Sequence, residues 1–523
     1  MPLPASNTPW PPREWKPILN DMRRWEAWWV GDTSMLASVY QRDQHRHPAD
    51  RPQRRGLVGF VERFFWGRIN TNPNGQPSRS DLHIPMASDL CATSADLLYG
   101  APPTILTASS QTNDQLERYR DDGLFEQLLS GAELGAALGG RYQRVTWDPA
   151  ISDRPFLSTV DADSALPEFR WGHLVAVTFW TVLQRDGAVV WRHVERHELD
   201  TAGNGIVFHG LYEGTEDNLG RQRELTLHPA TASLANVVVE DHVAQGITRG
   251  LAVAYIPNIT PQRRWRHHPN AKDLGRSDLD GVEGLMDALD ETYSSWMRDL
   301  RLGKARVFAD RSMLENRSPN SSEQVFDLDT EIFTPIDGLG GSMQSQLPIQ
   351  PQQFQIRVNE HETTAQDLVH RIINGACYSA ATFGDDAQDA QVTATEIKAR
   401  QAKTSSTRDR KIRVEKPALQ QLIVKMLLTD QAVFNTPGLN PTDLAVNFPP
   451  LVQQTTDGNA QTVATLKQAG LMSNQVGVQM AHPDWDQTQV DEEVARIQAE
   501  QPLSSPDQWT PTPGEVTSGA GSQ

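Results

Sequence analysis

Cysteine is scarce in this chain. Its 523 residues include two cysteines, Cys91 and Cys377, which lie far apart and form no Cys-x-x-Cys pair. Two thiols this far apart argue against both a thiolate zinc site and a disulfide framework. The sequence therefore predicts a protein that is made and kept in a reducing compartment.

Long apolar runs are also missing. No stretch of 18 apolar residues occurs, which argues against a transmembrane helix. The residues after Met1 contain no basic segment followed by an apolar one, so no secretory signal is predicted. We expect no membrane partner and assembly in the cytoplasm.

Positive charge is in deficit. The chain has 48 Lys and Arg against 66 Asp and Glu, which gives a formal net charge of −18. Non-specific DNA binding depends on cations that neutralise phosphates. A chain with this balance is not expected to grip DNA along its whole surface. If it handles DNA, it should let the duplex slide or touch it locally.

The motifs of common enzymes are absent. The sequence has no GxxxxGK[ST], HExxH or GxSxG, and no GxGxxG after a predicted strand. His45 and His47 have no suitably spaced partners for a metal. We therefore predict no catalytic residues, no cofactor and no metal site. Scattered carboxylates leave open a nuclease that would bring two or three of them together around divalent metal.

The first 277 residues combine helical and β-rich segments. Apolar spacing and stop signals predict helices at 14–40, 81–98 and 124–138, the last ending at Gly139-Gly140. β-Rich runs separated by Asp, Gly and Asn turns lie at 141–147, 175–183, 189–197, 206–212 and 251–256. We expect an α+β fold in which these runs form one twisted antiparallel sheet.

The second half has a different order of elements. An amphipathic helix at Asp278–Leu302, about 35 Å long and capped by Ser277, precedes β-like runs at 305–309 and 324–333. A second helix is expected at about 360–380, then a polar loop. A long helix from Ala394 to about Phe434 should be kinked at Pro417. Helices at 463–471 and 491–501 precede a Pro- and Ser-rich end.

This order of elements, together with several short sequences, resembles the portal proteins of tailed bacteriophages. Ile256-Pro257-Asn258, Gly275–Leu279 and Leu285–Thr292 are similar to the run into the family's first stem helix. Thr393–Lys398 is similar to the start of the long helix after the channel loop in portals of long-tailed phages. Asn447–Pro450 and Ala469–Ser473 resemble the C-terminal region. The likeness covers roughly residues 80 to 500, and the tryptophan-rich first 40 residues match no family pattern.

The resemblance implies a portal fold assembled as a ring. The N-terminal region and an α/β wing would occupy 1–277, a helical stem 278–302 and 358–380, and a small β-rich clip 303–357. A tunnel loop would occupy 381–393, and a long kinked wing helix with its connection 394–461. Crown helices would follow at 462–501, and a disordered tail at 502–523.

The resemblance also implies a function. About twelve identical subunits would close a channel at one vertex of the capsid, for DNA packaging and ejection. The implied partners are double-stranded DNA, the large terminase subunit, the head–tail adaptor, and the major capsid and scaffolding proteins. The protein would belong to the virion after assembly in the host cytoplasm, and it would be structural rather than an enzyme. A metal-dependent phage DNA-processing enzyme and another minor capsid protein are the alternatives.

Two sets of side chains are candidates for lining the channel and for contacts between subunits of such a ring. The tunnel loop would line the channel with Phe383 and with acidic and amide groups that repel phosphate and so reduce drag on DNA: Asp385, Asp386, Gln388, Asp389 and Gln391. Cations of the long helix would pair with acidic faces of neighbouring subunits: Lys398, Arg400, Lys403, Arg408, Arg410 and Lys411. Considered locally, the loop is an ordinary solvated turn. The cations also fit a solvated helix face, and DNA contact is the third interpretation.

Two further charged clusters have simpler explanations. Arg263–His268 could touch DNA or a partner, although a surface loop explains it better. Asp287, Asp290 and Glu291 could look like paired catalytic acids. We expect them instead on the solvated side of the amphipathic helix or in a subunit contact.

Overall fold

The chain folds into two compact units, Met1–Pro449 and Pro450–Gln523. The computed structural model describes residues 3–44, 82–148, 151–236, 238, 243–302, 306–310, 334–336, 349–352, 357–384, 401–451, 463–469, 472–481 and 487–500. Helices and strands are both abundant, which confirms the α+β class. Within these ranges no helix combines the length and the apolar character needed to cross a membrane.

The N-terminal tryptophans belong to the core of the first unit. The turn η1 (Arg13–Trp15) and helix α1 (Lys16–Val30) bury Trp15, Trp25 and Trp28. Helix α1 ends at Gly31, whose φ of 71° provides a left-handed C-terminal cap, and α2 (Thr33–Gln44) follows. The single helix predicted at 14–40 is therefore wrong, because this glycine divides it.

Three more helices pack in this part of the unit: α4 (Met86–Tyr99), α5 (Ser110–Asp121) and α6 (Leu124–Leu138). Helix α6 has the predicted bounds and ends at Gly139 with φ 91°. A side chain could not replace hydrogen there, since a Cβ would lie 2.9 Å from the carbonyl oxygen of Gly275. The predicted stop signal is thus also a close contact between two segments of the backbone.

The β-rich region forms two antiparallel sheets rather than the one predicted. In the smaller, β2 (Gly140–Thr146) lies between β3 (Phe156–Asp161) and β10 (Val253–Pro257). The larger has the order β4 (Ala165–Arg170), β5 (His173–Asp186), β6 (Val189–Leu199), β7 (Asn204–Thr215) and β8 (Asn218–Arg223), with β9 (Val243–Arg249) also paired to β7. The five predicted runs all form strands. The prediction that they form a single sheet is wrong, because β10 pairs with β2, which lies more than 100 residues earlier in the chain.

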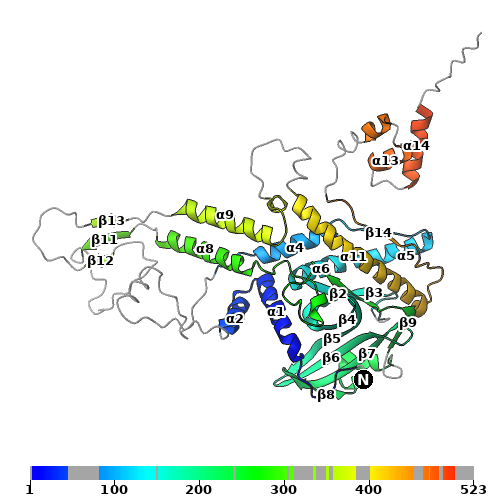
Figure 1. Ribbon diagram of the computed structural model, residues 1–523, viewed down its shortest axis with the longest axis horizontal. Helices are drawn as coiled ribbons and strands as arrows, with labels where there is room; N and C mark the ends of the chain where they lie inside the picture. The colour runs from blue at the N-terminus through cyan, green and yellow to red at the C-terminus, as the bar shows by residue number, and fades with distance from the viewer. Residues whose placement is uncertain are drawn as a thin grey trace, which may run out of the picture. The chain divides into compact units, whose positions relative to one another are not determined.

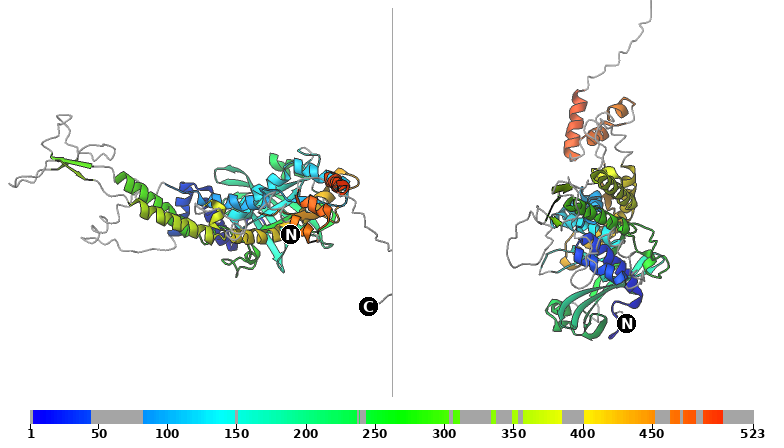
Figure 2. Two further views of the ribbon diagram at one scale, coloured as in Figure 1. Left: turned by 90° about the horizontal axis from the view of Figure 1, so that it is seen from above. Right: turned by 90° about the vertical axis from the view of Figure 1, so that its left-hand side faces the viewer.

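The helices α8 (Glu283–Leu302) and α9 (Val358–Gly375) lie side by side and extend away from these sheets (Figures 1 and 2). Beyond their far end, β11 (Arg306–Asp310) lies between β12 (Thr334–Ile336), to which it is parallel, and the antiparallel β13 (Ile349–Gln352). Helix α8 begins five residues later than predicted because turns occupy 278–282, where Gly281 has φ 91°. The run predicted at 324–333 lies outside the described residues.

Helix α11 (Ala402–Thr429) is the longest helix described. It continues through Pro417 and passes into the π-helical turn η8 (Asp430–Phe434). Its apolar residues, including Leu419, Ile423 and Met426, join a core with α4, α5 and α6. The predicted start at Ala394 lies outside the described residues. Strand β14 (Ala445–Asn447) follows and pairs with β1 (Thr104–Leu106).

Short elements connect these parts. They are η2 (Ala162–Ser164), η3 (Leu225–Leu227), α7 (Pro229–Ala232), η4 (Ser233–Asn236), η5 (Ala271–Asp273) and η7 (Ala380–Phe383). The second unit contains a helical stretch at 463–468, α13 (Asn474–Ala481) and α14 (Gln487–Glu500). Two C-terminal helices were predicted there, and α13 was not among them. The predicted disordered tail at 502–523 lies outside the described residues.

Candidate functional site

A buried polar cluster joins the start of α8 and the end of α9 to the rest of the first unit. The side chain of Asp278, just before α8, is fully buried, and one of its oxygens lies 2.8 Å from Lys411 Nζ. The same oxygen accepts a hydrogen bond from the Tyr378 hydroxyl at 2.8 Å, and the other accepts one from Asn258 Nδ2 at 2.8 Å. We call Ser94, Asn258, Asp278, Tyr378 and Lys411 the junction cluster.

Lys411 of α11 connects most of the junction cluster. An ammonium group has three hydrogens to donate, and Nζ lies 2.5 Å from Ser94 Oγ, 2.8 Å from Asp278 Oδ2 and 3.0 Å from the Tyr378 oxygen. Burial raises the pKa of Tyr378 well above its usual range, with the Asp278 charge adding to the shift, so the phenol remains a donor. Segments from α4, β10, α8, α9 and α11 therefore meet at one satisfied network.

A second buried ion pair lies one helical turn further along α11. Glu415 accepts two hydrogen bonds from Arg141 of β2, at 2.9 and 3.0 Å, and a third from the Tyr99 hydroxyl at 2.9 Å. Burial, followed by the Glu415 charge, raises the pKa of Tyr99. Bidentate pairing of this kind fixes geometry as well as charge. It aligns α11 with β2 and α4.

The start of α8 is attached to the N-terminal helix. Glu283 accepts hydrogen bonds from Trp25 Nε1 at 3.0 Å and from the backbone N–H of Gly281 at 2.7 Å. Arg264 lies within 4 Å of three carboxylates, those of Asp21, Asp280 and Glu283. The predicted basic cluster at 263–268 is thus a loop, as expected, but its Arg264 connects α1 to the base of α8.

Asp290 does not lie on the solvated helix face where the sequence placed it. The residue is 8% exposed, and it accepts a hydrogen bond from the backbone N–H of Ile84 at 2.9 Å while its other oxygen lies 2.8 Å from His83 Nδ1. The solvated position predicted for Asp290 was wrong because the segment that it contacts, just before α4, is more than 200 residues away in the chain. Glu291 is exposed, as predicted.

Polar and aromatic contacts hold the far ends of α8 and α9 together. Asp299 of α8 accepts hydrogen bonds from His361 Nε2 at 3.0 Å and from Arg357 Nη2 at 3.1 Å. These two partners lower the pKa of Asp299. Trp296 stacks on the His361 ring, with centroids 6.0 Å apart and planes 9° from parallel. These contacts hold α8 against α9 at the ends away from the junction cluster.

The predicted loop residues lie just after this helix pair. Phe383 packs edge-on against Tyr378, with ring centroids 6.1 Å apart, so it touches the junction cluster. The remaining candidates lie outside the described residues: Asp385, Asp386, Gln388, Asp389 and Gln391.

The six predicted interface cations have different environments. Lys398 and Arg400 lie outside the described residues. Arg408 and Lys411 are buried, and Arg408 donates to the carbonyl oxygens of Leu97 and Pro449. The contacts of these two are internal to the chain. Lys403 and Arg410 are exposed, although each also donates to a carbonyl oxygen of its own chain, those of Asn374 and Thr260.

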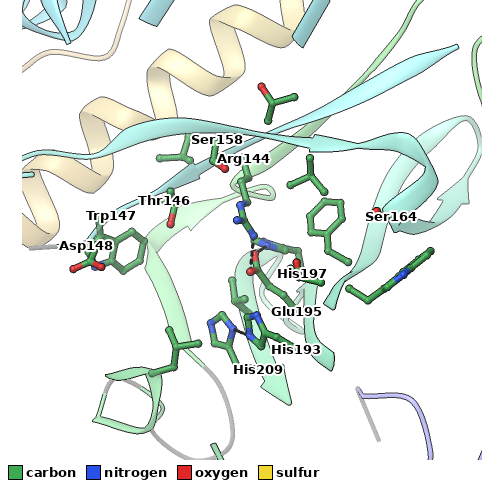
Figure 3. Close-up of a pocket in the computed structure, with 18 of the residues that line it drawn as sticks. Arg144, Thr146, Trp147, Asp148, Ser158, Ser164, His193, Glu195, His197 and His209 are labelled. Carbon is green, nitrogen blue, oxygen red and sulfur yellow. Dashed lines mark hydrogen bonds and ion pairs between the residues drawn. The ribbon is translucent and has the colours of Figure 1, made fainter. Parts of the chain in front are cut away.

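A cavity of about 680 Å³ is lined by both sheets, and none of the residues predicted from the sequence to be functional lies in its wall. Figure 3 shows Glu195 close to His197 and Arg144, and His193 beside His209, among the residues that line this cavity. A signal for part of this group was available: in His193-Val194-Glu195-Arg196-His197 three polar side chains alternate along a strand, which places them on one face. His209, on the next strand, gives no such signal.

Comparison with known proteins identifies the family. The family model described as "Phage portal protein, SPP1 Gp6-like" matches residues 68–506. The chain therefore belongs to the SPP1 Gp6-like family of phage portal proteins, which confirms the resemblance found in the sequence. The buried tryptophans of α1 precede the matched region. The family is one of structural proteins.

Comparisons with curated proteins and with solved structures do not extend this assignment. No curated protein matches the chain. Among solved structures, a chain of "Neck of empty GTA particle computed with C6 symmetry" is similar at 13% sequence identity and a TM-score of 0.40. The match covers 80% of this chain and 92% of that one.

Proposed function

We propose that this chain is the subunit of a ring-shaped channel at one capsid vertex, through which phage DNA is packaged and later ejected. The family match over residues 68–506 is the observation that carries the proposal. Identical subunits close into a ring when each contacts the next through two different surfaces and the rotation closes. A ring of about twelve subunits is our expectation.

The order of elements along the chain suggests which part of the ring each element forms. Helices α8 and α9 are the proposed stem, and the segment 303–357, which includes β11, β12 and β13, is the proposed clip. The α/β region before α8, together with the long helix and its connection at 394–461, would form the wing, and residues 462–501 would form the crown. The junction cluster supports this division, because it fixes both stem helices to α11 through buried contacts.

Residues 381–393 are the proposed tunnel loop. The segment follows α9 and precedes α11, and it begins beside the junction cluster, where Phe383 packs against Tyr378. Asp385, Asp386 and Asp389 would present negative charge to the DNA. Repulsion of phosphate avoids tight contacts, each of which would slow a sliding duplex.

Contacts between subunits are proposed along the stem and at α11. Met297 and Leu300 of α8 and Val358 of α9 are large apolar residues that are 39–40% exposed in the single chain. Neighbouring stems in a ring would cover them. Of the candidate cations that the structure describes, Lys403 and Arg410 are exposed and could pair with the acidic surface of the next subunit.

The proposed partners are the terminase motor and then the head–tail adaptor, both at the clip, and the major capsid and scaffolding proteins. We expect the motor's ATP to supply the energy and this chain to catalyse nothing. A metal-dependent DNA-processing enzyme would need several carboxylates around its metal. Among the described residues, the group with metal-binding geometry contains a single carboxylate, Glu195.

The mass and shape of the purified protein test this proposal. One subunit has a mass of 58.2 kDa, so a ring of about twelve would approach 700 kDa. Native mass spectrometry should find this species, and negative-stain images should show rings with a central hole. A protein that remains a monomer or dimer at every salt and subunit concentration would contradict the proposal.

A further inference from the structure

Four polar side chains of β6 and β7 face the cavity between the two sheets. His193, Glu195 and His197 alternate along β6, so they share a face of the larger sheet. In the register of the two strands, Glu195 lies opposite His209 of β7. Side chains of directly opposed residues are neighbours in an antiparallel pair. Strand pairing therefore gathers two imidazoles and a carboxylate at one place.

The two imidazoles are arranged as metal ligands would be. His193 Nε2 and His209 Nδ1 share a hydrogen bond of 3.1 Å, which a metal bound to both nitrogens would replace, and the rings are stacked with an interplanar angle of 15°. One ligand atom from each of His193, Glu195 and His209 lies within 4.8 Å of the other two. A tetrahedral Zn²⁺ with bonds of 2.0–2.1 Å holds its nitrogens about 3.3 Å apart. The observed spacing of the nitrogens needs only a small adjustment.

The carboxylate is held in place by two further side chains. One oxygen of Glu195 lies 2.5 Å from His197 Nε2, and the other accepts a hydrogen bond from Arg144 Nη1 at 2.5 Å. Partners that orient a ligand from outside are a regular part of metal sites. Each carboxylate oxygen has a second lone pair, so these contacts do not exclude a metal bond.

Charge around the group is mixed. Arg144 is a cation beside Glu195, and its presence opposes a divalent ion. Two further acidic residues, Asp148 and Asp161, line the same cavity. The choice of metal follows from the donors: imidazole favours Zn²⁺ and related transition metals, whereas Ca²⁺ and Mg²⁺ prefer a full set of oxygen ligands.

We propose that His193, Glu195 and His209 form a Zn²⁺ site in which a water from the cavity completes the coordination. The ion would connect β6 to β7 on the face toward β2 and β3. Binding to the folded chain alone would stabilise the α/β region, since a ligand that binds only the native state shifts unfolding by mass action. The site is independent of the proposed ring and channel.

Zinc titration of the full-length protein tests the site. Protein stripped with a chelator and dialysed should bind added ZnCl₂ with one high-affinity site per subunit, and its Tm should rise with the ZnCl₂ concentration. His193→Gln and His209→Gln should each lower the affinity by more than about 100-fold, because changes in the outer partners alone cost about 10- to 100-fold. His173→Gln is the matched control: His173 is exposed on β5 of the same sheet, and its loss should leave the affinity unchanged.

Two results of the titration would overturn the proposal. One is wild-type protein that binds no Zn²⁺, and the other is Zn²⁺ affinity that both histidine variants retain, which would place the metal on other residues. Spectroscopy of wild-type protein keeps the test decisive if the variants fail to fold. Co²⁺-loaded protein should show the strong visible absorption of a four-coordinate ion, and X-ray absorption of the Zn²⁺ form should find two imidazole ligands. A six-coordinate Co²⁺ spectrum with no imidazole scattering at zinc would refute the site.

Discussion

Replacement of Lys411 by Met should destabilise the first unit strongly. The side chains of Lys411 and Asp278 are 4% and 0% exposed, and their charged atoms lie 2.8 Å apart. At an effective dielectric constant of about 20, the attraction at that distance is about 6 kcal/mol, which offsets the cost of burying both charges. Without the ammonium, Asp278 keeps its neutral donors, Asn258 and Tyr378, but its charge stays buried. Loss of one partner from such a pair costs about 3–5 kcal/mol.

Guanidinium unfolding followed by tryptophan fluorescence measures this cost. All variants must be compared at one subunit concentration, because the proposed ring assembly would contribute to apparent stability. The double variant D278N/K411M removes both charges and should be about 2 kcal/mol more stable than K411M. The control K403M changes an exposed lysine of the same helix and should cost less than about 0.5 kcal/mol. A cost below about 1 kcal/mol for K411M, or additive costs of D278N and K411M, would refute this reasoning.

Three further predictions concern pH, the loop and the clip. Burial lowers the pKa of Lys425 to about 8 from its ordinary value of 10.5. Between these two pH values the unfolded chain binds more protons than the folded chain, so the free energy of unfolding should rise with pH by up to about 1.4 kcal/mol per pH unit. An equal slope in K425M would contradict this prediction. Changing Asp385, Asp386 and Asp389 to Lys should leave rings intact but reduce DNA packaging measured by nuclease protection; unchanged packaging would remove the loop from the DNA path. Replacing 303–357 with a short Gly/Ser linker should abolish binding of the terminase motor in a pull-down while part of the ring assembly survives, and retained binding would place the clip elsewhere.

Local signals predicted many elements well. Helix α6 was placed correctly because its apolar period ends at Gly139, whose backbone must be left-handed. The five β-rich runs were also predicted correctly as strands, because turn residues mark the ends of each run. Their division into two sheets could not be predicted. It depends on β10 pairing with β2 across a long stretch of chain, which no local pattern records.

Buried charge was the main source of wrong placement. In the sequence, Asp290 looks like a residue of a solvated helix face, because its partners His83 and Ile84 are distant in the chain. Lys411 is similar: its partner Asp278 is 133 residues away. The cavity histidines were missed for a related reason, since His193 and His209 become neighbours only when β6 and β7 pair. Composition predicts how many charges a chain carries, and tertiary structure decides which are buried.

The most direct test of the account is a cryo-EM reconstruction of the purified assembly. We predict a closed ring in which α8 and α9 of every subunit surround a passage wide enough for a DNA duplex, with residues 381–393 at its narrowest point. A ring whose axis is lined by other elements, with α8 and α9 on its outer surface, would contradict the account.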